Sequence, residues 1–371
     1  MDWPEARALF PSVDKIVYLN TAGGGPLSER SAAAGRAYYE QSLADGDIHW
    51  DAWLERVEAV RGELARFLNA RPANIAFTAN ASTGLNVAAH MLRGRGRVLA
   101  VADEFPSCTL PFLQLGHDVD FVTAAADGAL DIDQLEAAAS ETTAVLAVSF
   151  VQYKSGFRND LECLGAFCRQ RGLTFVIDAT QGFGAFPIDV AANHADFLSF
   201  SAYKWATSGY SIGAVYVSDR FLVPASYPLV GWRSAREPYD LTSDSLDVTP
   251  DARALEQGHP PFAGVFALGA SLDLVAEIGI DRIAARIVEL TRYLHQRLDA
   301  AGIGVLSTRD ESHQSGITVA AAEDPGDVVR RLRAEGVIVS TRGAGIRVSV
   351  HYYNNRADID QFVAALAATG A

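Results

Sequence analysis

Three apolar stretches of the sequence end in residues that can do chemistry. The run TFVI is followed by Asp178, and the run DFLSF is followed by Ser201, Tyr203 and Lys204. A third run, NIAFT, is followed by the small and hydroxyl residues ANASTG at 79–84. A buried carboxylate and a buried ammonium group are both costly unless each meets a partner. The sequence therefore predicts that these groups meet at one site.

The stretch 79–84 has the composition of an anion site. A helix-like segment, GLNVAAHML, follows it at 84–92. Small and hydroxyl residues at a helix N-terminus leave backbone N–H groups free for an anion and add side-chain donors. Two simpler interpretations stay open at this point: Ser82 is only the N-cap of that helix, and Lys204 is one half of a structural ion pair.

The elements that must position these residues alternate between strands and helices. Helix-like segments such as 161–172 lie between several apolar runs that are continuous, as is typical of strands buried on both faces. This pattern predicts an α/β fold with a mostly parallel seven-stranded sheet, in which ligands bind beyond the C-terminal ends of the strands. The runs lie at 74–78, 97–101, 119–123, 144–150, 174–178, 196–200 and 214–218.

The pattern changes after the seventh run. A proline- and serine-rich stretch occupies 220–262, a long helical region follows at 266–302, and short strands and helices continue to the segment 358–368. We therefore expect a large α/β domain over 16–250 and a smaller α+β domain formed by 1–15 and 251–371.

The overall composition excludes several classes of protein. The chain has 371 residues, 49% of them hydrophobic, and a net charge of −14, which argues against a nucleic-acid partner. No apolar run reaches the ~18 residues of a membrane span, and the N-terminus carries acid where a signal peptide carries base. The three cysteines and eight histidines have no metal-ligand spacing. The sequence thus predicts a cytoplasmic protein without a metal site.

A lysine, a carboxylate and an anion site at one sheet edge suit pyridoxal 5′-phosphate. Its aldehyde forms a Schiff base with Lys204, its pyridine nitrogen stays protonated beside Asp178, and its phosphate takes N–H and O–H donors. A dinucleotide fits less well, because the Gly182-x-Gly184 pair is followed by Pro187 where a helix should run.

The ordered motifs resemble the class V aminotransferase family of fold-type I pyridoxal-phosphate enzymes. This family includes cysteine desulfurases, selenocysteine lyases, kynureninases and isopenicillin N epimerases. The resemblance runs from VYLNTAGGGPLS at 17–28 to IRVSVHYYNNRADIDQF at 346–362. It implies the fold-type I architecture, action at Cα of an amino-acid substrate through an external aldimine, and a homodimer whose partners share their active sites.

The resemblance also implies roles for individual residues. Lys204 is the Schiff-base lysine and Asp178 the pyridinium partner, while Gln181 bonds the phenolate oxygen. Arg347 grips the substrate carboxylate with its two-pronged donor set. The phosphate site comprises Ala81, Ser82, Ser201 and Tyr203, the stacking ring is Phe105, the substrate pocket includes Asn20, Thr21 and Ala22, and the partner's contributions are Trp232 and His259.

Some of these residues also have simpler interpretations. Tyr203 and Phe105 could be packing residues, and Arg347 could be a surface charge. Lys154 either meets the substrate or points to solvent, and His259 stands where many relatives have a hydroxyl residue.

One departure from the family bears on the reaction. Desulfurases carry a catalytic cysteine on a loop shortly before the carboxylate-binding arginine, whereas the interval 339–348 here, VSTRGAGIRV, has none. The sequence therefore favours a β-eliminating, C–S lyase-like enzyme that needs no catalytic cysteine. An aminotransferase and an epimerase or racemase are the alternatives, and a non-catalytic cofactor-binding protein is the most remote. The substrate stays open.

Overall fold

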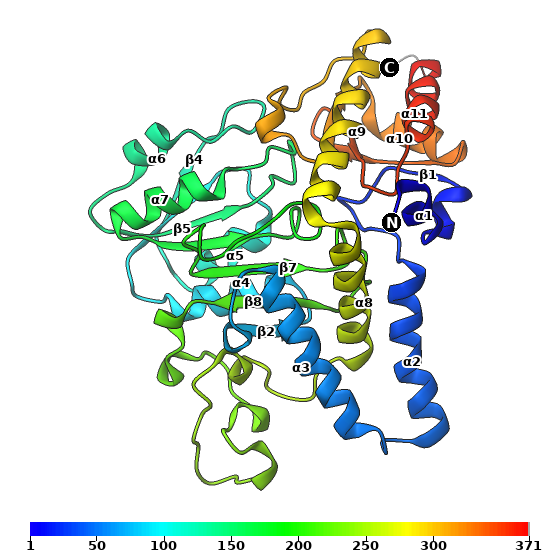
Figure 1. Cartoon of the computed structure of the whole chain (residues 1–371). Helices are drawn as coiled ribbons and strands as arrows, with labels where there is room; N and C mark the ends of the chain where they lie inside the picture. Colours follow the sequence, from blue (N-terminus) through cyan, green and yellow to red (C-terminus); the bar gives the residue numbers. More distant parts are fainter. Residues whose placement is uncertain (370–371) are drawn as a thin grey trace.

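A seven-stranded sheet forms the centre of the larger part of the molecule (Figure 1). The computed structural model describes residues 1–369. The strand order is β2-β8-β7-β6-β5-β3-β4, and only β8 runs antiparallel to its neighbours. The strands are β2 (Ile75–Thr78), β3 (Arg97–Val101), β4 (Val119–Val122), β5 (Thr143–Ser149), β6 (Thr174–Asp178), β7 (Phe197–Ser201) and β8 (Gly213–Val217). All seven predicted strands and the mostly parallel sheet are confirmed.

Helices cover both faces of this sheet, as its continuous apolar strands require. Successive strand residues alternate between two cores: Val98, Val145 and Val176 pack with α4 and α5, whereas Leu99 and Leu146 pack with α3, α7 and α8. The helices of this part are α2 (Glu29–Asp45), α3 (Trp50–Phe67), α4 (Ala81–Met91), α5 (Pro106–Gln114), α6 (Ile132–Ala138), α7 (Leu161–Arg171) and α8 (Phe262–Ile278).

The predicted helical region at 266–302 is two helices. α8 ends at Ile278 and α9 (Ile280–Ala300) leaves it at 79°. Gly279 joins them with a φ of 93°, a conformation that glycine adopts without a steric penalty. No single helix of residues 1–369 is long and apolar enough to cross a membrane, although α8 and α9 taken together pass by length and composition.

A second, smaller group of elements is formed mainly by the C-terminal part of the chain (Figure 1). The antiparallel sheet β11-β12-β9 consists of β11 (Ser340–Arg342), β12 (Gly345–Ser349) and β9 (Ile317–Ala321). β1 (Val17–Tyr18) pairs with β10 (Val337–Ile338), so an N-terminal segment joins this group. The group also contains α1 (Trp3–Ala8), α9, α10 (Pro325–Ala334) and α11 (Arg356–Ala368). The domain boundaries near 16 and 250 stay predictions.

Gly84 lets α4 lie unusually close to the sheet. A Cβ at this position would stand 2.3 Å from Ser199 Oγ and 2.9 Å from Val215 Cβ. The absence of a side chain therefore brings the N-terminus of α4 against the end of β7, where Ser201 lies.

Candidate active site

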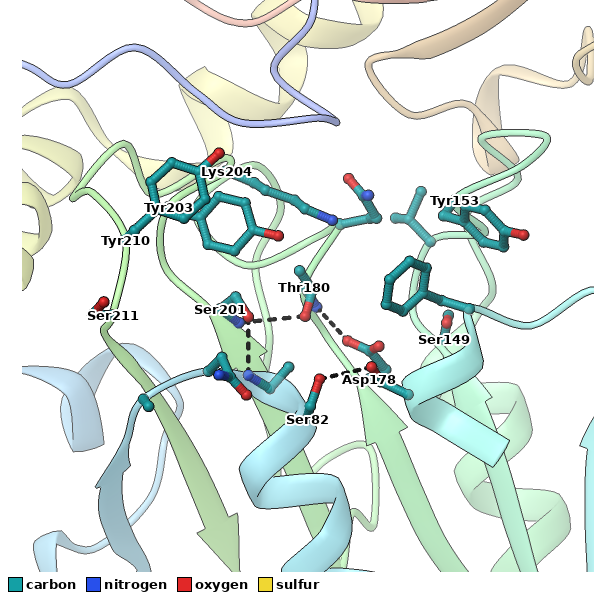
Figure 2. A pocket seen from close by; sticks show the side chains of 17 residues that line it. Ser82, Ser149, Tyr153, Asp178, Thr180, Ser201, Tyr203, Lys204, Tyr210 and Ser211 are labelled. Atoms are coloured by element: carbon teal, nitrogen blue, oxygen red, sulfur yellow. Dashed lines mark hydrogen bonds between the residues drawn. The ribbon is translucent and has the colours of Figure 1, made fainter. Parts of the chain in front are cut away.

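A cavity of about 390 Å³ opens at the C-terminal edge of the large sheet (Figure 2). The parallel strands β2, β5, β6 and β7 all end there, which is where a sheet of this type binds ligands. The residues predicted from the sequence that line it are Ala81, Ser82, Phe105, Asp178, Gln181, Ser201, Tyr203 and Lys204. Residues up to 123 positions apart in the chain thus meet at one site, because the carboxyl ends of parallel strands lie at the same edge of the sheet.

Asp178 is a buried carboxylate, and only one of its two oxygens accepts a hydrogen bond among the described residues. It ends β6 and accepts the backbone N–H of Thr180 at 2.9 Å through Oδ1 (Figure 2). Burial raises the pKa of Asp178, and the nearby Lys204 lowers it. No arginine or lysine of residues 1–369 forms an ion pair with it. One carboxylate oxygen is therefore available to a cationic ligand group.

Lys204 enters the cavity from the turn after β7 (Figure 2). Lys204 is only 7% exposed. Burial lowers the pKa of its amine to about 8; the charge of Asp178 opposes this shift, whereas Arg347 and Arg342 add to it. Within the described part of the chain Nζ forms no salt bridge, so the structural ion pair is not what holds it. A lysine with a depressed pKa is suited to attack a carbonyl or to act as a base.

The N-terminus of α4 supplies the anion site. Its N-cap is Asn80, whose side chain accepts the Thr83 N–H at 3.0 Å, so Ser82 is not the cap. Ser201 Oγ accepts the Ala81 N–H at 2.9 Å, and the hydroxyls of Ser82 and Ser107 lie 2.7 Å apart. Helix N–H groups and these hydroxyls together form the kind of donor set that binds phosphate.

Gln181 is held in place from both ends of its amide. Nε2 donates to the carbonyl oxygen of Ala22 at 3.1 Å, and Oε1 accepts from Trp205 Nε1 at 2.8 Å. One N–H of the amide stays free for a ligand oxygen. Gln181 therefore points a fixed donor at the cavity and ties the N-terminal turn to it.

Arg347 lies on β12, just behind the cavity lining. It is 2% exposed, and it donates to the backbone oxygen of Tyr153 at 3.2 Å and to Ser340 Oγ at 3.3 Å. Burial, helped by Arg342, lowers the pKa of Arg347 to about 9. It forms no ion pair with any acid of residues 1–369. A buried guanidinium that has no carboxylate partner in the protein can bind the carboxylate of a ligand. Because Arg347 is buried, the interpretation of it as a surface charge is wrong.

The N-terminal turn lies beside the cavity without lining it. Thr21 is fully buried with its hydroxyl 2.6 Å from that of Tyr353, and the Ala22 N–H donates to Ser349 Oγ at 3.0 Å. Asn20 Oδ1 is buried and has no hydrogen-bond partner among residues 1–369. Of the three, only Ala22 reaches a cavity residue, through Gln181. Their substrate contacts stay predictions.

Trp232 and His259 lie outside the cavity of their own chain. Their rings contact each other at 4.9 Å between centroids, and His259 also meets Trp50 at 4.8 Å. Lys154 points away as well, since it is exposed and pairs with Asp103 at 2.8 Å. Phe105 stands over the Lys204 amine and meets Tyr153 edge-on, so it is a cavity residue rather than part of the core.

Several residues of the site are absent from the sequence-based prediction. The most notable is Glu104, a buried acid that accepts from Gln152 Nε2 at 2.7 Å and from the Ser149 N–H at 2.8 Å. Burial raises the pKa of Glu104 to about 7, and Asp178 contributes to the rise. The available signal was the acidic pair Asp103 and Glu104, which comes one residue after the apolar run 97–101. The other additions are Ser107, Ser149, Tyr153, Thr180 and Tyr210, whose ring stacks on Tyr203 at 4.3 Å.

These side chains fit pyridoxal 5′-phosphate. The buried Asp178 has a free oxygen that could meet a pyridine nitrogen, and Lys204 has a depressed pKa and no salt-bridge partner within the described chain. The N-terminus of α4 lies at the same cavity and would hold a phosphate. Phe105 supplies an aromatic face at the same cavity.

Comparison with known proteins decides the family. The family model described as aminotransferase class-V matches residues 17–362. The chain belongs to the class V aminotransferase family. A probable cysteine desulfurase from Methanothermobacter thermautotrophicus is 28% identical over an alignment of 383 positions, which covers 96% of this chain and 95% of the relative.

Several solved structures share the fold. A cysteine desulfurase from Thermococcus onnurineus matches with a TM-score of 0.91 at 24% identity, covering 100% of this chain and 98% of that one. The cystine C–S lyase C-DES, in complex with its product cysteine persulfide, matches with a TM-score of 0.87 at 21% identity over 96% and 99% of the two chains. Another C-DES structure contains glycine covalently linked to its pyridoxal-phosphate cofactor.

The likeness to these structures shows the fold-type I architecture. The match to the class V aminotransferase family, a family of pyridoxal-phosphate enzymes, gives pyridoxal 5′-phosphate as the cofactor. This member of the class V aminotransferase family is thus a pyridoxal-phosphate-dependent enzyme of the lyase or aminotransferase type.

Proposed function

We propose that this enzyme is a β-eliminating lyase that cleaves a C–S bond of an amino acid without a catalytic cysteine. The observation that carries the proposal is the position of the thiols: Cys108, Cys163 and Cys168 are all absent from the cavity lining, and Cys108, the neighbour of the lining residue Ser107, is buried. Persulfide transfer needs a thiolate at the reacting sulfur, whereas elimination requires only a base and a leaving group.

The chemistry of the three thiols supports this proposal. Cys108 and Cys168 are buried, and burial raises the pKa of both far above the usual range of a thiol. Cys163 is exposed on α7, and its thiol pKa is also raised, first by burial and then by Asp160. Each thiol is therefore a poor nucleophile near neutral pH.

The segment before Arg347 offers no substitute loop. β11 and β12 are joined directly by Gly343 and Ala344, and the register pairs Arg342 with Gly345. A turn of this length is too short to act as a mobile loop that brings a catalytic side chain over the cavity. This supports a reaction carried out by the residues around the cofactor site alone.

The protein's own groups have distinct tasks in such an elimination. Bound pyridoxal phosphate supplies an electron sink at Cα. Arg347 holds the substrate carboxylate, and Lys204 Nζ, with its pKa near 8, takes the proton from Cα. The Cβ–S bond then breaks with its electron pair on sulfur. Water converts the released aminoacrylate to pyruvate and ammonia.

Product analysis tests the proposal. The holoenzyme is incubated with S-substituted cysteines, and pyruvate, ammonia, thiol and other keto acids are measured together, with Lys204→Ala as the control. We expect equal amounts of pyruvate, ammonia and thiol from the wild type and none from the variant. A keto acid that retains the sulfur substituent, formed with loss of the amino group to the cofactor, would instead identify an aminotransferase.

A further inference from the structure

Two arginines occupy the same face of the small sheet next to the cavity. In the antiparallel pair β11 and β12, Arg347 stands opposite Ser340, and its Nε donates to Ser340 Oγ at 3.3 Å. Arg342 lies two residues beyond Ser340 on β11, and residues two apart in a strand share a face. Arg342 and Arg347 are therefore diagonal neighbours, whose side chains reach each other across a strand pair.

Both guanidinium groups contact Tyr153, a residue of the cavity lining. Arg347 Nη1 donates to the Tyr153 carbonyl oxygen at 3.2 Å, and the Arg342 guanidinium carbon lies 5.3 Å from the centre of the Tyr153 ring. The ring also meets Phe105 at 5.3 Å on the cavity side. Tyr153 thus stands between Arg342 and the place of the reaction.

The described residues provide no counter-ion for Arg342 and Arg347. Within residues 1–369, neither Arg342 nor Arg347 has an acidic side chain at ion-pair distance, and the nearby Lys154 uses Asp103. Arg342 Nε is buried and has no hydrogen-bond partner in the described chain. Arg342 lowers the pKa of both Arg347 and Lys204, so its charge is felt at the site. Two adjacent cations without counter-ions are unfavourable because they repel each other and are partly removed from water.

A second cavity adjoins Arg342. It measures about 260 Å³ and includes Gln152, Lys154 and Ser155 in its lining together with Arg342. The segment 151–155 separates it from the first cavity, since Val151 and Tyr153 line the first and the intervening residues line the second. Asp103 also lines this second cavity and pairs with Lys154, which leaves Arg342 as its unpaired charge among the described residues. A substrate that extends past Tyr153 therefore meets the Arg342 guanidinium.

We infer that the substrate carries a second anionic group, on the substituent beyond Cβ, and that Arg342 binds it while Arg347 binds the α-carboxylate. This inference rests on the proposed function for the leaving group, but the preference for an anion is a property of binding. The substrate class is an S-substituted cysteine, or a similar amino acid, whose side chain ends in a carboxylate or another oxyanion. Arg342 is then a specificity residue.

The test compares two ligands that differ in charge alone: S-carboxymethyl-L-cysteine and S-carbamoylmethyl-L-cysteine. Binding is measured by calorimetry on the cofactor-loaded Lys204→Ala protein, because this substitution prevents turnover. The measurement is made with Arg342 intact and with the additional substitution Arg342→Gln or Arg342→Lys. We expect the acid to bind at least about tenfold more tightly than the amide, as for a charge-assisted hydrogen bond. Arg342→Gln should abolish that preference and Arg342→Lys should retain part of it. Arg330→Gln, on an exposed face of α10, is the matched control and should keep the full preference.

The outcomes separate this inference from the proposed function. Equal affinity for the acid and the amide, or an unchanged preference in Arg342→Gln, overturns the role of Arg342 even if both compounds release pyruvate. A preference for the acid that depends on Arg342 supports the role even if no pyruvate appears, in which case the lyase proposal fails alone. The thermal midpoint of the Arg342→Gln variant should equal that of the wild type. This measurement shows whether a loss of binding is caused by a loss of folding.

Discussion

Lys204 Nζ lies 5.5 Å from the centre of the Phe105 ring, so the amine faces an aromatic surface at the entrance to the site. Asp178, the acid whose charge acts on this amine, does not form a salt bridge with it, and burial is the largest influence on the pKa of Lys204. The protein thus keeps a lysine with a much larger uncharged fraction near neutral pH than an ordinary lysine has, and that free amine can attack a carbonyl carbon.

Cofactor loading should accelerate with pH. Only the free amine attacks an aldehyde, and the pKa of Lys204 is about 8, below its usual value. The rate of reconstitution of the cofactor-free protein should therefore rise about tenfold between pH 7 and pH 9 and then level off. Stopped-flow absorbance of the lysine-linked cofactor measures it. A rate still rising steeply above pH 10 would mean that the lysine titrates normally.

Asp178→Asn should separate stability from activity. Burial raises the pKa of Asp178, so its ionised form costs folding free energy, and this cost appears as the pH rises from the usual value through the raised one. Asparagine keeps an oxygen for the Thr180 N–H but has no charge. We expect a thermal midpoint at pH 7 no lower than that of the wild type for the cofactor-free protein, and a fall in kcat/KM of about 10²–10³. A destabilised but active variant would contradict the assigned role.

Arg347→Gln should weaken substrate capture. Because the guanidinium is buried and unpaired in residues 1–369, its removal costs no ion pair, and the thermal midpoint should not fall. The loss of charge-assisted bonds to a carboxylate should lower kcat/KM about 10- to 100-fold. Arg347→Lys should recover only part, since lysine lacks the planar two-pronged donor set. Binding of a carboxylate inhibitor by titration checks the effect, and an unchanged affinity in the glutamine variant would refute it.

Trp232 and His259 lead to a prediction about assembly. They contact each other outside their own cavity, and we propose that they complete the site of a partner in a homodimer. If so, the inactive Lys204→Ala protein and a Trp232→Ala/His259→Ala double variant should complement each other after unfolding and reassociation. Roughly a quarter of wild-type turnover should return, because half of randomly paired dimers are mixed and each contains one complete site. A mixture no more active than its parents would show that the two residues act in their own chain or not at all.

Much of the site follows from strand ends. Asp178, Lys204 and the 79–84 turn each follow a continuous apolar run, and a parallel sheet must bring such ends together. The strands were therefore predictable within a residue or two. Gly279 illustrates what was not, since the sharp bend between α8 and α9 depends on a backbone conformation that a helical pattern does not encode.

The less predictable residues depend on tertiary contacts. Glu104 was overlooked because an acid after a strand is ordinarily solvated, and only the hydrogen bonds from Ser149 and Gln152 make its burial possible. The pairing of Arg342 with Tyr153 likewise arises from the meeting of β11 with the loop after β5, more than 180 residues away in the chain. Sequence alone gives no register for such contacts.

The most direct test of the central claim is the fate of the carbon skeleton of L-cysteine incubated with the holoenzyme. Elimination gives pyruvate, ammonia and sulfide, whereas transfer of the sulfur to a protein thiol leaves alanine. We predict pyruvate as the carbon product, with the same yield and rate in Cys163→Ser, which removes the exposed thiol. Alanine as the carbon product, with persulfide on a protein cysteine and loss of turnover in Cys163→Ser, would contradict the account.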